Sequence, residues 1–121
     1  MHQPHVIIVE DDAAASESIR CLLHAYQFST TNYHSGEAFL GVDDRPECDC
    51  LLIDMQLPGM NGLQLQETIH AMGSATPALL ISGHIDSSTR ADASRLNVSA
   101  VLEKPVNPER LIREIKNAIE N

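Results

Sequence analysis

Aromatic side chains are scarce in this chain of 121 residues, which has no tryptophan, two tyrosines and two phenylalanines. Apolar residues still make up 43% of the sequence, an ordinary share for a globular protein. The core must therefore be built from leucine, isoleucine, valine and alanine. A chain of this length buries roughly two-thirds of the surface of its unfolded form, enough for one domain but hardly for two. We expect residues 1–121 to form a single domain.

Basic side chains are also few, since 8 lysines and arginines stand against 17 acidic residues and the net charge is −9. A surface that binds nucleic acid is normally basic, so we expect no direct nucleic-acid binding by this domain. An acidic domain instead suits cations or basic patches on a partner protein.

Cysteine is limited to Cys21, Cys48 and Cys50, an odd count that excludes a complete disulfide framework. Free thiols favour a reducing compartment. Two closely spaced thiols at Cys48 and Cys50 are weak evidence for a soft-metal site, and we expect structural thiols instead.

Long apolar runs are absent, and none approaches the roughly 20 residues that a membrane span requires. The first five residues are polar and lack the apolar core of a signal peptide. These observations predict a soluble, cytoplasmic protein without a membrane anchor.

Strand-like and helix-like segments alternate from end to end. The strand-like segments are residues 6–9, 28–33, 50–53, 78–82 and 100–102, and the helix-like segments are residues 12–26, 37–40, 63–72, 86–96 and 107–120. Apolar strands that alternate with amphipathic helices predict an α/β fold, with a parallel sheet covered on both faces. Ligands of such sheets bind at the carboxyl ends of the strands.

Local signals support several of these helices. Asp12 and Ser35 are residue types that cap helix N-termini, and Pro108 suits a first turn. In residues 12–26, helical spacing predicts one buried face, made of Ile19, Leu22, Leu23 and Tyr26.

Polar side chains end four of the five strands. They are Glu10 and Asp11 after the first strand, Asp54 after the third, Ser82 on the fourth and Lys104 after the fifth. Several carboxylates at one sheet edge repel one another unless a cation lies among them. Carboxylate oxygens are ligands that Mg²⁺ prefers, so the pattern predicts a magnesium site.

Asp54 has the character of a nucleophile in this setting, because a carboxylate can attack phosphorus to form an aspartyl phosphate. Lys104 can supply a second cation, and the Ser82 hydroxyl can donate to a phosphoryl oxygen. The alternative is a solvated rim of weak surface ion pairs. Five matching groups on four strand ends favour the site.

Four motifs carry a family resemblance, in order and at family spacing. They are Glu10-Asp11-Asp12, residues 52–62 around Asp54, Ile81-Ser82-Gly83-His84 and Leu102-Glu103-Lys104-Pro105. Over nearly its whole length the chain resembles the receiver domain of two-component response regulators. It is most similar to the subgroup of the nitrogen-fixation regulator FixJ and its LuxR-type relatives. The resemblance implies a flavodoxin-like (βα)₅ fold with strand order 2-1-3-4-5.

The resemblance also implies roles for the site residues. Asp54 would accept a phosphoryl group from a histidine kinase. Asp11, Asp54 and the backbone carbonyl of Gln56 would bind Mg²⁺ directly, and Glu10 would act through water.

The resemblance also has implications for the residues from the fourth strand onward. Lys104 and Ser82 would hold the phosphoryl group, and the Lys104–Pro105 peptide bond would be cis. The surface of residues 86–96, 100–102 and 107–120 would switch on phosphorylation, so the chain would be a signalling module and not a metabolic enzyme.

One position departs from the family pattern. Phe or Tyr usually stands three residues before the lysine, and here that position is Val101. A valine cannot make the same large inward swing. This argues against coupling of phosphorylation to the switching surface through an aromatic ring. Gln56 and His84 would border the water that hydrolyses the aspartyl phosphate, so we hypothesise that they set its lifetime by orienting or excluding that water.

Two rival functions remain. An aspartate-nucleophile phosphatase usually has a second acid two residues after the nucleophile, where this chain has Gln56. A binding-only pseudo-receiver would form no adduct at Asp54.

We expect the chain to be a fragment cut before a C-terminal DNA-binding effector domain. Phosphorylation-dependent homodimers would use the fourth and fifth helices.

Overall fold

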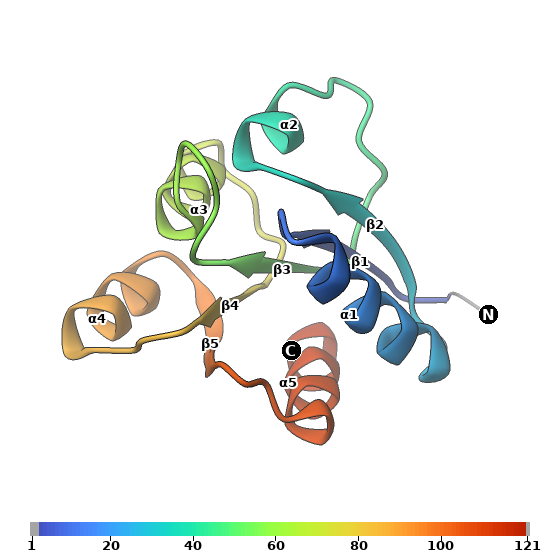
Figure 1. The fold of residues 1–121 in the computed structure, drawn as a ribbon. Helices are drawn as coiled ribbons and strands as arrows, with labels where there is room; N and C mark the ends of the chain where they lie inside the picture. The colour runs from blue at the N-terminus through green and yellow to red at the C-terminus, as the bar shows by residue number, and fades with distance from the viewer. Residues whose placement is uncertain (1–2, 121) are drawn as a thin grey trace.

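Strands and helices alternate along the chain in the computed structural model, which describes residues 3–120 (Figure 1). The strands are β1 (His5–Val9), β2 (Ser29–Tyr33), β3 (Cys50–Asp54), β4 (Ala78–Ser82) and β5 (Val98–Glu103). The helices are α1 (Ala13–Ala25), α2 (Gly36–Leu40), α3 (Gly62–Ala71), α4 (Ser87–Arg95) and α5 (Pro108–Glu120). Within residues 3–120, no helix is both long enough and apolar enough to cross a bilayer.

All five strands pair in parallel in the order β2-β1-β3-β4-β5. The predicted α/β class and flavodoxin-like strand order are therefore confirmed. The chain runs outward from β1 to β2 and then returns past β1 to β3, so the strand order reverses between β1 and β3. Register partners there include Val9 and Ile53, so the residues that follow both strands emerge side by side.

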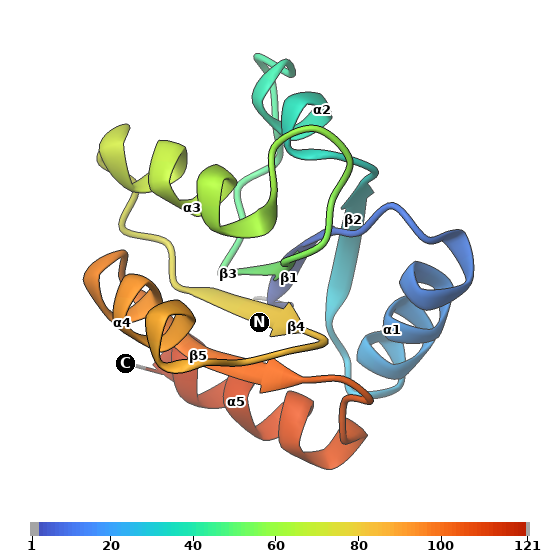
Figure 2. The ribbon, with the colours of Figure 1, turned by 60° about the vertical axis from the view of Figure 1, so that its left-hand side comes forward.

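Alternate residues of each strand enter two different cores, one on each face of the sheet. Val6 and Ile8 of β1 pack beneath α1 and α5, and Ile7 and Val9 pack beneath α2, α3 and α4. Figures 1 and 2 show this division, with α1 and α5 on one face. Burial on both faces explains why β1, β3 and β4 are continuous apolar runs.

Helix N-termini form where the sequence places capping residues. Asp12 Oδ1 accepts a hydrogen bond from Ala14 N at 2.9 Å, and Ser35 Oγ accepts one from Ala38 N at 3.0 Å. Both predicted caps are confirmed. Asp86 caps α4 instead of forming its first turn.

Two predictions about element ends were wrong. Tyr26 lies past the end of α1 and is 45% exposed, because Gln27 adopts a left-handed φ of 71° that turns the chain toward β2. Strand β5 runs over Val98–Glu103, and its register against β4 shifts between Ala78 and Leu79. Backbone pairing extends β5 beyond the apolar run on which the prediction of residues 100–102 depended.

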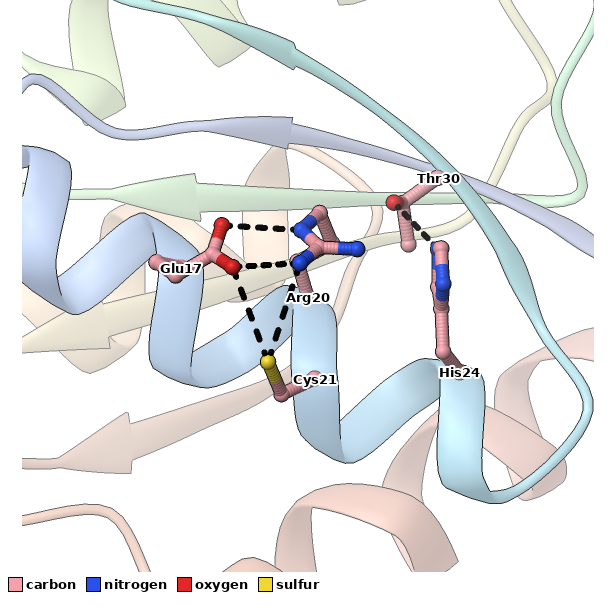
Figure 3. Close-up of polar contacts among 5 residues, drawn as sticks. All are labelled: Glu17, Arg20, Cys21, His24 and Thr30. Atoms are coloured by element: carbon pink, nitrogen blue, oxygen red, sulfur yellow. Dashed lines mark hydrogen bonds and ion pairs between the residues drawn. The ribbon is translucent and has the colours of Figure 1, made fainter.

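The outer face of α1 carries a local polar network (Figure 3). Arg20 donates to both carboxylate oxygens of Glu17, and the Cys21 thiol lies 3.7 Å from Glu17 Oε1. His24 Nε2 and Thr30 Oγ1 are hydrogen-bonded at 3.1 Å, which joins α1 to β2. These contacts are exposed to solvent, so each adds little to stability.

The three cysteines are free thiols in very different surroundings. Cys21 is exposed on α1, whereas Cys50 is fully buried in β3. Burial, followed by the charges of Cys48 and Asp49, raises the pKa of the Cys50 thiol to about 12. Burial, reinforced by Asp49, raises the pKa of Cys48 to about 11.

Alkylation of the native protein at pH 8 should therefore modify Cys21 at least about tenfold faster than Cys48 or Cys50, because only the accessible thiolate reacts. Peptide mass spectrometry after timed exposure to iodoacetamide measures the three rates. In urea the three rates should converge, and C21S should remove the fast phase. Equal labelling of Cys50 and Cys21 in the native protein would contradict the described packing.

Candidate functional site

Three carboxylates meet at the carboxyl ends of β1 and β3. Single oxygens of Glu10, Asp11 and Asp54 lie within 4.8 Å of one another. Glu10 is 4% exposed and Asp54 is 3% exposed, whereas Asp11 faces solvent. The cluster is therefore not a solvated rim, because two of its three carboxylates are withdrawn from water. Such a set of hard oxygen donors, open on the Asp11 side, suits Mg²⁺.

Both oxygens of Asp54 are held by hydrogen bonds. Lys104 Nζ donates to Asp54 Oδ2 at 2.9 Å, across 50 positions of the sequence. The backbone N–H of Gln56 donates to Asp54 Oδ1 at 2.9 Å. The carboxylate is thereby fixed in orientation, as a nucleophile or ligand requires.

Lys104 reaches Asp54 from the end of β5, and its backbone N–H donates to Ser82 O at 2.9 Å. Partial burial disfavours the ammonium, but the hydrogen bond and charge of Asp54, with the charges of Glu10 and Asp11, outweigh it and raise the pKa of Lys104. The lysine is therefore the cation that balances part of the acidic cluster. The Lys104–Pro105 peptide bond is cis, as the resemblance implies.

Glu10 is the carboxyl group most affected by this crowding. Burial, followed by a hydrogen bond with Asp54 and the charge of Asp54, raises the pKa of Glu10 from 4.5 to about 7. The backbone N–H of Asp12 donates to Glu10 Oε2 at 3.2 Å and acts in the opposite direction. Near neutral pH, Glu10 thus carries a proton part of the time.

Ser82 ends β4 beside this cluster and is buried. Its hydroxyl donates to His84 O at 2.7 Å and accepts from His84 N at 3.2 Å. Both interactions are local, so the Ser82 hydroxyl ties the end of β4 to the loop that leads into α4. The proton of the Ser82 hydroxyl therefore points at the backbone carbonyl oxygen of His84.

The remaining predicted positions surround the site. The side chains of Gln56 and His84 are exposed on the two loops that follow β3 and β4. Val101 is half-buried on β5, where it is the register partner of Leu80 and packs against the core beneath α2, α3 and α4. Strand β4 lies between Val101 and Asp54, which is on β3.

The loop after Asp54 returns so closely that no side chain fits at Gly62. A Cβ at Gly62 would lie 2.4 Å from Asp54 O, and the Gly62 N–H donates to Met55 O at 2.9 Å. Asn61 and Gln64 then form a reciprocal capping box that starts α3. The structural role of Gly62 is therefore to allow this close approach of the backbone.

Sequence reasoning missed Glu37, a residue of α2 that supports the same loop. Glu37 Oε2 accepts from Met60 N at 3.2 Å and lies against Gly59, whose φ is 72°. The two partners are 23 positions apart, and no local pattern connects them.

An apolar groove of about 360 Å³ opens next to the site, between α1 and α5. Its walls include Ile19, Leu22 and Val106, and Glu10 and Lys104 lie among its lining residues. A partner seated in this groove would therefore approach the acidic cluster.

Substitution E10Q should raise the midpoint of thermal unfolding in EDTA at pH 8 by on the order of 5 °C. The folded pKa of about 7 exceeds the unfolded value of 4.5, so the native protein binds this proton more tightly and loses stability as pH rises through that range. Gln lacks the charge that causes the loss. The gain should shrink toward pH 4.5.

Melts of wild type, E10Q and the exposed control E47Q across pH 4.5–8 measure this effect. E47Q should shift the midpoint by no more than about 1 °C at any pH. A midpoint for E10Q below that of wild type at pH 8 would show that the Glu10 charge stabilises the native state.

The architecture of this chain is similar to that of solved structures of receiver domains and response regulators. A CheY-like receiver domain protein from Methanospirillum hungatei JF-1 has a TM-score of 0.90 over 98% of this chain and 95% of its own, at 23% identity. The response regulator StyR has a TM-score of 0.88 over 98% of this chain and 60% of its own, at 31% identity.

Proteins of similar sequence are also named as regulatory proteins. The transcriptional regulatory protein FixJ of Bradyrhizobium diazoefficiens is 32% identical over 115 residues, and the response regulator protein TodT of Pseudomonas putida is 30% identical over 114. These alignments cover 95% and 94% of this chain but 56% and 50% of FixJ and TodT, so the chain spans about half their length. The predicted likeness to FixJ is confirmed. The family model described as the response regulator receiver domain matches residues 6–116, and the chain belongs to that family.

Proposed function

We propose that this chain is the phosphoacceptor domain of a two-component response regulator, with residues 1–121 forming one receiver domain. Asp54 takes a phosphoryl group from a phosphohistidine of a histidine kinase. The observation that carries the proposal is the buried Asp54 carboxylate, held by Lys104 Nζ and Gln56 N among two further acids. A buried carboxylate whose two oxygens are both held in place, beside further acids at the carboxyl ends of the strands, has the properties of a functional group.

The transfer requires little covalent chemistry from the protein. An Asp54 oxygen attacks phosphorus, the new O–P bond forms as the P–N bond of phosphohistidine breaks, and the leaving imidazole nitrogen keeps the electron pair and takes up a proton. Lys104 and Ser82 stabilise charge on the phosphoryl oxygens. For this, the Ser82 hydroxyl exchanges its bond to His84 O for one to the phosphoryl group.

Mg²⁺ is the cofactor that suits the acidic cluster. Asp11, Asp54 and the Gln56 carbonyl are its proposed direct ligands, and Glu10 acts through water. When bound, the ion would neutralise part of the negative charge on the oxygens of the incoming phosphoryl group. Hard carboxylate oxygens grouped within 4.8 Å support this assignment.

The output is a conformational switch of the α4–β5–α5 surface, so the domain signals and does not turn over a metabolite. The Ser82–His84 hydrogen bonds connect the phosphoryl site to the loop that ends at Asp86, the cap of α4. This connection does not pass through Val101, which suits a chain without a ring at that position.

The proposed partners follow from the same surfaces. The apolar groove between α1 and α5 supports docking of the histidine kinase next to Asp54. The name of FixJ, a transcriptional regulatory protein, supports a role in regulating transcription. The part of FixJ and TodT that this chain does not match leaves room for the DNA-binding effector domain that we propose as a partner. We further propose a cytoplasmic location, and phosphorylation-dependent homodimers through α4 and α5.

Acetyl phosphate with Mg²⁺ should add the mass of one phosphoryl group to the protein, and D54N should abolish the addition because an amide is a poor nucleophile. Intact mass spectrometry measures the adduct. D12N is the matched control, since Asn also caps helices and Asp12 lies outside the carboxylate cluster.

Equal labelling of D54N and wild type would contradict the proposal. Absence of both a phosphoryl and a beryllofluoride adduct on wild type would favour a binding-only pseudo-receiver. Steady turnover of a generic phosphoester would favour the phosphatase.

Replacing both Gln56 and His84 by alanine should slow loss of the phosphoryl group from Asp54 about tenfold, because neither alanine can orient the attacking water. Decay of the phosphorylated protein after removal of acetyl phosphate measures the rate. H70A is the control, because His70 is an exposed histidine near the far end of α3. An unchanged decay would show that the two side chains do not set the lifetime, and a faster decay would show that they exclude the water instead of orienting it.

A further inference from the structure

Helix α4 is weakly anchored to the rest of the domain. Of its nine residues only Ala93 is buried, and Leu96, which ends the helix, is the next buried apolar residue. Helix α5 by comparison buries four side chains: Leu111, Ile112, Ile115 and Ala118. Apolar burial therefore contributes little to holding α4 in place.

A buried polar side chain of α3 compensates at one end of α4. Gln66 is 2% exposed, and its Nε2 donates to the backbone carbonyl of Leu96 at 2.9 Å. The two residues are 30 positions apart, and Figures 1 and 2 both place α3 beside α4 on the same face of the sheet. The amide thus joins α3 to the residue that caps the C-terminal end of α4.

The other half of this amide has no such partner. Within the described residues, Gln66 Oε1 is buried without a hydrogen bond. Burial of an unpaired amide oxygen costs free energy, which an apolar side chain of the same size would avoid. Gln66 is therefore a poor choice for packing alone, and the benefit that offsets this cost lies in the bond to Leu96.

The bond also lies where the chain leaves α4 and enters β5. Asn97 follows Leu96 with a left-handed φ of 63°, and β5 begins at Val98. Arg95 and Glu67 add an exposed ion pair at 3.9 Å across the same two helices, a contact of little energy. The opposite end of α4 begins with exposed Ser87 and Ser88 after the loop of His84.

We infer that the Gln66 amide is a latch that pins the C-terminal end of α4 to α3, so that α4 pivots there and its N-terminal end makes the larger movement. This inference rests on the proposed function, because the signal enters α4 from the Ser82–His84 loop. Gln66 is a positioning residue: it touches no reacting group and determines which part of α4 responds.

Hydrogen exchange of the full chain tests the latch. Q66M keeps the length of the side chain and removes the amide, so amides of residues 92–98 should exchange about tenfold faster than in wild type. E67Q removes only the exposed ion pair one position along and should change these rates less than about twofold. Amides of β1 and β3 report global stability, and Q66L serves as a second variant if Q66M unfolds.

The second arm adds Mg²⁺ and beryllofluoride. In wild type, exchange of residues 84–90 should change at least about threefold while residues 92–98 change less than about twofold; in Q66M the change should extend across the helix. Unchanged exchange in Q66M without beryllofluoride, or an equal response at both ends of wild-type α4, would overturn the latch.

Failure of the proposed function is a separate outcome. If no adduct forms on Asp54, the second arm shows no response anywhere, yet the comparison of Q66M with E67Q without beryllofluoride still decides whether Gln66 holds α4.

Discussion

Repulsion among Glu10, Asp11 and Asp54 is the interaction around which this domain is organised. Three carboxylates with oxygens within 4.8 Å of one another do not stay together by themselves, least of all when two are buried. Lys104 offsets one charge through its bond to Asp54, and the raised pKa of Glu10 leaves a second carboxyl partly protonated. The negative charge that remains supports the proposal that a cation binds in this cluster.

The rest of the fold holds those charges in place. The apolar strands β1 and β3 are packed from both faces, so their ends cannot separate without opening two cores. Close approach at Gly62 and support from Glu37 hold the loop that follows Asp54. A sheet packed on both faces therefore carries Asp54 at its carboxyl edge, and the neighbouring loops supply the remaining contacts.

Packing is distributed unevenly around this sheet. Helix α5 buries a full apolar stripe, whereas α4 buries one alanine and is joined to α3 by the Gln66 amide and an exposed ion pair. Regions with few buried contacts open at the lowest free energy, and switching elements are drawn from them. The polar composition of α4 is thus consistent with a helix that changes position while the sheet beneath it does not.

The order of the helices and strands, and the residue types at the ends of the strands, follow from the amino-acid sequence alone. Apolar runs predicted four strands and a weak alternation predicted β2, and polar residues at the strand ends indicated the candidate site, because these signals depend on neighbours in the chain. Tertiary structure alone decided which distant groups meet: the Lys104–Asp54 bond spans 50 positions, and the Gln66–Leu96 bond spans 30. It also left Tyr26 in solvent and extended β5 beyond its apolar run. Such features depend on strand register and on the space between packed elements, and local spacing carries no information about either.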